Sequence, residues 1–323
     1  MQGSGDNSSL SNNLLYDFSR VFMKITVQIL VGIFLYVNCL MIYTFLRKET
    51  FREETRYILF AQTLFTDSAL MVLSDTLSIM NNLFYPIHII PCAILCTVTT
   101  NLTICTPLTL VAMCLERYVA ICMPLRHADI STSRTRFRGL LIIWSISSII
   151  PLFTLVAYLA VIPSGALLSY TVCSVELMLG KDWQAQARSS MFQVLFLFMI
   201  IIIAFTYIKI MIAARGASSE NKKLTSRSLR TVALHAFQLF LCIMQFLNPY
   251  LEMVVLKIDM LAYAILRYAN FIIFIIAPRC LSPLIYGLRD EMFFHALKHH
   301  ALCDMKPSFI KLAFYACLFL FCV

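Results

Sequence analysis

Charge is scarce in this chain. Of its 323 residues only 13% are Asp, Glu, Lys or Arg, whereas 60% are hydrophobic. Soluble domains carry about 25% charged and about 45–50% apolar residues, so this composition excludes an ordinary water-soluble protein. Glycine (8 residues) and proline (10 residues) are also few, which excludes a collagen-like chain or a Pro/Gly-rich disordered one.

Catalytic and metal-binding patterns are missing too. The sequence has no glycine-rich phosphate loop, no His/Glu spacing of a metal site and no nucleophile elbow. We therefore expect no enzyme activity, no cofactor and no metal ion. The 26 Lys and Arg against 17 Asp and Glu give a net charge of +9, which in a soluble protein would suggest nucleic acid.

What the sequence does have is long apolar runs. A bilayer core needs about 20 apolar residues per helix, and runs of this kind recur along the chain. They predict an all-α membrane protein, a seven-transmembrane helix bundle with short loops. No internal repeat is visible, which argues against transporters built from paired halves. The runs are 22–46, 57–80, 89–116, 139–162, 189–213, 229–255 and 260–286.

The basic residues indicate how the bundle is oriented. Most of them fall after the first, third, fifth and seventh spans, so the positive-inside rule places the N-terminus outside and the C-terminus inside. The positive balance thus reports topology rather than affinity for nucleic acid. Residues 1–21 are polar and lack a signal peptide. We expect 1–21 to be extracellular, 22–288 to form the transmembrane domain and 289–323 to be cytoplasmic.

Cysteines and one sequon suggest covalent modifications. Of the 12 Cys, most lie inside spans, where buried apolar thiols are expected. Cys92 and Cys173 face the oxidising side, and a bridge between them would tie the long outer loop over the bundle; Cys96, one turn deeper, is the rival partner. Cys303 is a candidate for palmitoylation or a free thiol. Asn7 begins a glycosylation sequon.

Ionisable groups inside lipid are costly and are functional candidates by default. Asp67 lies in the middle of the second span, and Arg279 in the seventh is a plausible partner for it, with Asn38 completing a hydrogen-bonded cluster. A purely structural pair is the alternative. Asp75, about two turns nearer the outside, would either bind a cationic ligand group or be hydrogen-bonded at the outer rim.

The third and sixth spans hold further polar residues. Glu116 and Arg117 end the third span, where an arginine beside an acid is either a releasable ion pair or an interfacial arginine that reaches toward water. The third span also has many threonines, whose hydroxyls would bond back to their own helix. Alternatively, the outer threonines would line a ligand cavity. His235 is either a hydrogen-bond switch or a buried neutral histidine.

Three stretches carry a family resemblance. Seven spans with Glu-Arg-Tyr after the third resemble a class A (rhodopsin-like) G-protein-coupled receptor. Residues 113–127, MCLERYVAICMPLRH, look like the MAYDRYVAICxPLxY signature of odorant receptors, in the variant seen in fish. Residues 231–239, TVALHAFQL, are similar to the family's TCxxHL stretch, and 278–289, PRCLSPLIYGLR, to its PRxLNPxIYxxR ending. The resemblance covers about residues 20–300.

This resemblance implies a function and its parts. It implies an odorant receptor in the plasma membrane of olfactory sensory neurons, on their cilia. The receptor would couple to a stimulatory olfactory-type G protein, which signals through cyclic AMP. It also implies a short amphipathic eighth helix near 289–300, and Cys92–Cys173 as the outer disulfide. Asn38, Asp67, Trp144 and Tyr207 match the family's marker positions.

Two groups of residues follow from the family's arrangement. An apolar cavity among the outer halves of spans 3, 5, 6 and 7 would bind a small odorant through Thr99, Thr100, Thr103, Ile104, Met191, Phe192, Leu195, Phe246, Leu247, Tyr250 and Ile272. Activation and G-protein coupling would rest on Glu116, Arg117, Tyr118, Tyr207, His235, Pro283 and Tyr286.

Some positions depart from the family pattern. Ser282 replaces an Asn, Glu116 an Asp, and Ile243 the usual aromatic of span 6. Thr99 stands where amine receptors carry an Asp, which argues against amine ligands. After Pro307 the tail is apolar but too short to span a membrane. The alternatives are a receptor for a non-odorant ligand, a transporter or channel, and a non-signalling product.

Overall fold

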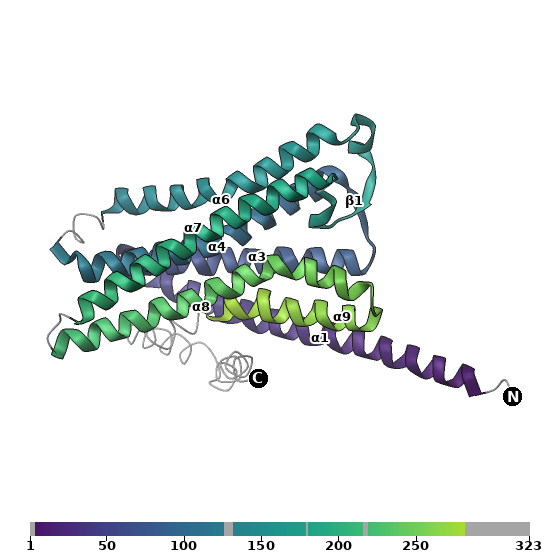
Figure 1. Cartoon of the computed structure of the whole chain (residues 1–323), viewed down its shortest axis with the longest axis horizontal. Helices are drawn as coiled ribbons and strands as arrows, with labels where there is room; N and C mark the ends of the chain where they lie inside the picture. The colour runs from purple at the N-terminus through teal and green to yellow at the C-terminus, as the bar shows by residue number, and fades with distance from the viewer. Residues whose placement is uncertain (1–3, 126–131, 179, 216–218, 282–323) are drawn as a thin grey trace.

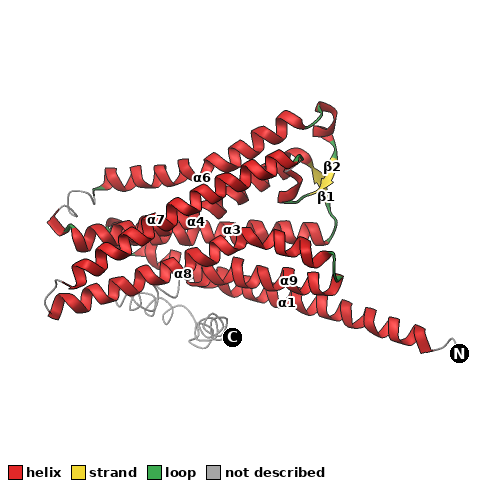
Figure 2. Cartoon of the chain, in the orientation of Figure 1, coloured by secondary structure: helices red, strands yellow, loops and turns green. Residues whose placement is uncertain are grey.

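The computed structural model describes residues 4–125, 132–178, 180–215 and 219–281. Long helices, lying roughly side by side along one axis, make up nearly all of this part (Figures 1 and 2). The longer helices are α1 (Ser4–Arg47), α3 (Thr55–Asn82), α4 (Ile89–Cys122), α6 (Ser133–Val161), α7 (Asp182–Arg215), α8 (Ser219–Leu256) and α9 (Met260–Asn270). The shorter segments are α2 (Glu49–Glu53), η1 (Ser164–Leu168), η2 (Val175–Met178) and the π-helical η3 (Phe271–Ile276).

The helical membrane fold predicted from composition is confirmed. Within the described ranges six helices are long and apolar enough to cross a membrane, and α8 adds the shorter apolar stretch Leu229–Gln245. Several helices begin earlier than the apolar runs: α1 starts at Ser4 and projects beyond the bundle (Figure 1). The predicted eighth helix and the apolar tail lie outside the described residues.

The long helices expose apolar side chains on their outer faces as well as burying them inside the bundle. On α7 the exposed residues include Val194, Leu197, Phe198, Ile201 and Phe205, while Phe196, Met199 and Ile203 are buried. In water such a surface would drive aggregation, whereas in a bilayer it contacts lipid at no cost. The outward apolar face is thus the structural counterpart of the charge-poor composition.

Helix α4 occupies the middle of the bundle. It packs against α3, α6, α7 and α8, and its residues from Ile104 to Leu110 are almost completely buried. Asn101 on α4 joins it to α6: its amide accepts a hydrogen bond from Ser147 (2.7 Å) and donates one to Ser148 (2.9 Å). Because of this central position, α4 contacts most of the other long helices of the bundle.

A small sheet closes one end of the bundle, which we call the hairpin end. Strands β1 (Pro86–His88) and β2 (Tyr170–Val172) pair antiparallel, with Ile87 opposite Thr171. Figure 2 shows the pair beside the starts of α4 and α7. At the opposite end, which we call the Arg117 end, α4 finishes at Cys122.

Candidate ligand cavity and activation machinery

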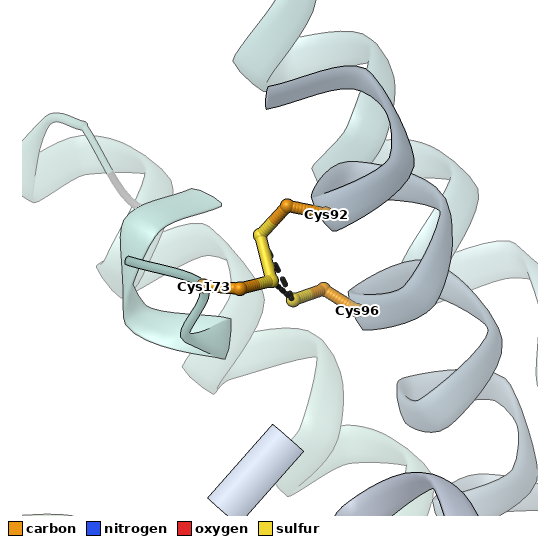
Figure 3. Close-up of side chains that lie close together, drawn as sticks. All are labelled: Cys92, Cys96 and Cys173. Carbon is orange, nitrogen blue, oxygen red and sulfur yellow. Dashed lines mark hydrogen bonds between the residues drawn. A yellow bond between two sulfur atoms is a disulfide. The ribbon is translucent and has the colours of Figure 1, made fainter. Parts of the chain in front are cut away.

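A disulfide fixes the loop that follows β2. Cys173 is bonded to Cys92 in the first turn of α4, with an S–S distance of 1.98 Å and both residues buried. The predicted pairing is confirmed. The rival, Cys96, is a buried thiol whose sulfur lies 3.8 Å from that of Cys173 and 4.0 Å from that of Cys92 (Figure 3). The bond holds the loop over the bundle at its hairpin end.

Below this loop lies a cavity of about 320 Å³ between α3, α4, α7, α8 and α9. It reaches from the disulfide down to Arg279. Its position between the helices agrees with the expected one, except that α3 also forms a wall. The lining residues are Leu70, Ser74, Leu77, Ser78, Asn81, Thr99, Thr100, Thr103, Cys173, Ser174, Val175, Arg188, Phe192, Gln245, Asn248, Glu252, Arg267, Asn270, Phe271, Ile275 and Arg279.

The cavity is more polar than the sequence led us to expect. The polar lining residues that were missed are Ser74, Ser78, Asn81, Ser174, Arg188, Gln245, Asn248, Glu252, Arg267 and Asn270. A signal for the three on α8 was present, because positions 245, 248 and 252 fall on one face of a helix. Polar residues repeated along one face of a membrane helix point inward, and this pattern identifies them.

The predicted threonines lie in the cavity wall and also bond to their own helix. Thr99 donates to Leu95 O (2.7 Å), Thr100 to Cys96 O (2.8 Å) and Thr103 to Thr99 O (2.8 Å). These three threonines therefore bond to their own helix and also line the cavity, so the two alternatives do not exclude each other. Because each hydroxyl has one proton, this wall offers acceptors and methyl groups to a ligand rather than donors.

Of the other predicted lining residues, Phe192 also lies in the cavity wall. Met191 and Leu195, by contrast, line a separate apolar hollow between α6 and α7 with Ile146 and Ile149, so we leave them out of the cavity. The cause is helical phase, since neighbours on an α-helix point about 100° apart.

Three further predicted residues, Ile104, Ile272 and Asp75, do not line the cavity. Ile104 is buried in the central core, and Ile272 packs with residues of α1, so both are removed from the proposed site. The side chains of Phe246, Leu247 and Tyr250 lie outside the described residues. Asp75 does not line the cavity either: its carboxylate accepts a hydrogen bond from Gln28 on α1 (2.7 Å), which matches the rim alternative.

At the bottom of the cavity the structure brings Asp67 and Arg279 together. Arg279 Nε lies 4.0 Å from Asp67 Oδ1, and both side chains are 1% exposed. The same carboxylate oxygen accepts a hydrogen bond from Thr106 on α4 (2.7 Å). Asn38 is also buried, but it donates to Ser68 (3.0 Å) rather than to Asp67. The cluster therefore joins α3, α4 and the helical turn that follows η3.

The local backbone explains how Arg279 is held. Pro278 has no N–H, so the carbonyl of Phe274 lacks its usual helical donor, and the preceding turn is π-helical. Arg279 Nη1 donates to the carbonyls of Phe274 and Ile275. Its Nη2 donates to Gln245 Oε1 on α8 (3.4 Å). Since Gln245 and Arg279 both line the cavity, the cavity floor and the buried ion pair share a side chain.

Three of the predicted activation residues, Glu116, Arg117 and Tyr118, are consecutive near the Arg117 end of α4. Arg117 Nε lies 3.5 Å from Glu116 Oε2, and the Tyr118 ring lies 5.8 Å from that of Phe205 on α7. Tyr207 packs against the central core.

On α8, His235 is completely buried, which leaves both alternatives for it open. Pro283, Tyr286 and Cys303 lie outside the described residues, as does the side chain of Asn7.

Comparison with known families decides what this arrangement is. Residues 37–286 match the family described as 7 transmembrane receptor (rhodopsin family). The chain belongs to this family of receptors. This membership sets aside the transporter and channel alternatives, agrees with the expectation that the chain is not an enzyme, and makes the chain a multi-pass plasma-membrane receptor. The receptor is also 53% identical over 302 residues to Odorant receptor 131-2 of Danio rerio, covering 94% of this chain and 92% of that protein.

Proposed function

We propose that this receptor detects a small odorant and passes the signal to a stimulatory, olfactory-type heterotrimeric G protein. The observation that carries the proposal is the 53% identity to a protein named an odorant receptor, over nearly the full length of both chains. The cavity supports it, because a volume of about 320 Å³ is at the small end of the range for small-molecule sites.

Signalling would follow a population shift between two arrangements of the bundle. A ligand can bias them only through its differential affinity for each. A ligand that contacts Gln245 at the cavity floor would affect Arg279 through the hydrogen bond between these two side chains. The change would pass from Arg279 to Asp67 through their ion pair. At the other end, rearrangement of Arg117 together with the other predicted activation residues would open the G-protein site; these are Glu116, Tyr118, Tyr207, His235, Pro283 and Tyr286.

The proposed topology places the hairpin end outside the cell. The positive-inside rule supports this, since the basic loops follow the helix ends at the Arg117 end. A disulfide at the hairpin end agrees, because such bonds persist in oxidising compartments. The expected site is the ciliary plasma membrane of olfactory sensory neurons, with Asn7 glycosylated outside.

The test is expression with the olfactory stimulatory G protein and a cyclic AMP readout across an odorant panel. We expect at least one odorant to raise cyclic AMP in a saturable way, and no response in cells lacking the receptor. A receptor that reaches the surface but activates only a different G-protein class would disprove the coupling. A response confined to hormones or amines would instead favour a receptor for a non-odorant ligand.

A further inference from the structure

One carboxamide in the cavity wall, that of Asn248 on α8, has no hydrogen bond to any of the described residues. Asn248 is only 8% exposed. Its side chain carries two N–H donors and a carbonyl oxygen that accepts. Buried polar side chains are nearly always hydrogen-bonded, because leaving them unpaired costs free energy. The cavity therefore contains a donor and an acceptor that a ligand can satisfy.

The neighbours of Asn248 on the same wall already have partners. Three residues earlier, Gln245 Oε1 accepts a hydrogen bond from Arg279 Nη2 at the cavity floor (3.4 Å). Four residues later, Glu252 Oε1 accepts one from Asn270 Nδ2 (2.9 Å), toward the cavity mouth at the hairpin end. Residues three and four apart are neighbours on a helix surface. Asn248 thus lies between two anchored side chains, halfway along the α8 wall.

The α4 wall adds acceptors but no donors. Thr99, Thr100 and Thr103 donate their protons to backbone carbonyls, while each hydroxyl oxygen can still accept. Much of the remaining lining is apolar: Leu70, Leu77, Phe192, Phe271 and Ile275. A cavity of about 320 Å³ with this lining suits a ligand that has one small polar group on a hydrocarbon body.

A hydroxyl is the small polar group that matches this lining. Its oxygen can accept from the Asn248 N–H, and its proton can go to the Asn248 carbonyl or to a threonine oxygen. An ether or carbonyl oxygen only accepts, so it would leave the acceptors of both walls unpaired. A carboxylate also only accepts, and an ammonium group only donates. Neither charged group can serve both halves of the carboxamide.

We propose that the cavity binds a small neutral alcohol, whose hydroxyl is hydrogen-bonded to the Asn248 carboxamide and whose hydrocarbon body lies against Leu70 and Phe271. Asn248 is then the residue that determines specificity for the hydroxyl. This inference rests on the proposed function and names the class of ligand for that same cavity.

The test compares alcohols with their isomeric methyl ethers in the cyclic AMP assay. The two members of a pair have the same atoms, and the ether lacks only the hydrogen-bond donor. We expect the alcohol to activate the receptor at concentrations about tenfold or more below the ether, because the ether leaves a buried acceptor unpaired. Equal potency within the pairs, or higher potency of the ether, overturns the proposal. A carboxylic acid or primary amine of the same skeleton that is more potent than the alcohol also overturns it.

Variants of Asn248 then test the assignment of the hydroxyl. Asn248→Leu should raise the half-maximal concentration of the alcohol by about tenfold and change that of the ether by less than about threefold. Asn248→Ser keeps one donor and one acceptor and should retain part of the preference for the alcohol.

The matched control is Gln186→Leu, which removes an exposed carboxamide on α7 outside the cavity lining. It should leave both half-maximal concentrations unchanged. An equal shift for alcohol and ether in Asn248→Leu, which a merely structural defect would produce, overturns the assignment. A control variant that lowers the preference for the alcohol as much as Asn248→Leu overturns it too.

The outcomes separate this inference from the proposed function. If ketones, esters or hydrocarbons activate the receptor and no alcohol does, the receptor function stands and the ligand class is wrong. If no compound of any class activates it, both fall. Surface labelling accompanies every variant, and should the Asn248 variants stay inside the cell, the alcohol–ether comparison on the parent receptor decides.

Discussion

Asp67 and Arg279 form a buried ion pair, an arrangement that is costly unless hydrogen bonds complete it. Thr106 supplies one such bond to Asp67 Oδ1, and two backbone carbonyls with Gln245 accept bonds from the Nη atoms of Arg279. Among the described residues, Asp67 Oδ2 and Arg279 Nε have no hydrogen bond. The pairing was predicted from two ionisable residues in separate spans, because neither can stay alone in lipid. Their contacts with Thr106 and Gln245 were not predicted, because a neutral polar side chain in a membrane helix does not need a charged partner.

The pair predicts a specific pattern of stabilities. Asp67→Asn or Arg279→Gln alone leaves one buried charge without its partner and should destabilise the receptor by about 3–5 kcal/mol. The double variant removes both charges and should be closer to the parent. Thermal unfolding in detergent measures this. A double variant destabilised by the sum of the two single effects would show that the pair does not couple the two residues.

Cys96 predicts a substitute disulfide. Its sulfur is 3.8 Å from that of Cys173, so in Cys92→Ser it can form a bond to Cys173 instead. We expect Cys92→Ser to keep much of its surface expression, and Cys92→Ser/Cys96→Ser to lose most of it, because a native disulfide is worth about 2–5 kcal/mol.

Cys96→Ser is the control for this pair of variants, since it leaves the native bond intact. Peptide mapping by mass spectrometry identifies the link in each protein. A free Cys173 thiol in Cys92→Ser, at parental expression, would refute the substitution.

At the scale of the helices, sequence located the spans but not always their faces. Helix α7 is apolar on all sides, so nothing in its pattern says which side chains turn inward, and Met191 and Leu195 were assigned with Phe192. On α4 the threonines broke the apolar pattern, and their face could be inferred. The turn around Pro278 depends on tertiary contacts that no local pattern reveals.

Helical phase gives a prediction for α7. Phe192→Ala removes a ring from the cavity wall and should raise the half-maximal concentration of an activating odorant by about tenfold. Leu195→Ala, which changes a residue lining the hollow between α6 and α7, should change it by less than about twofold. Dose–response curves at matched surface expression compare the two. A larger effect at Leu195 would place the ligand in the hollow between α6 and α7.

At the scale of the whole molecule, the distribution of charge connects sequence, topology and function. The chain is poor in charge because most of its surface contacts lipid, and its basic excess lies mainly in the loops at one end. The remaining charges inside the bundle gather at the cavity mouth, the Asp67–Arg279 pair and the end of α4.

Topology is tested by glycosylation. Asn7 should carry an N-linked glycan if the N-terminus is outside. Asn101, which begins the second sequon, Asn101-Leu102-Thr103, should not, because its amide bonds to Ser147 and Ser148 within the bundle. Asn7→Gln should therefore remove the mobility shift that a glycosidase produces on a gel. Asn101→Gln at matched expression is the control and should keep the shift. A shift that survives Asn7→Gln would contradict the proposed glycan at Asn7.

The central claim is that ligand binding in the cavity drives G-protein activation through the Arg117 end. The most direct measurement is nucleotide exchange on purified stimulatory G protein by purified receptor in lipid, with and without an activating odorant. We predict faster exchange with the odorant, and a loss of that acceleration in Arg117→Ala although the odorant still binds. Equal acceleration by the parent and Arg117→Ala would contradict the account.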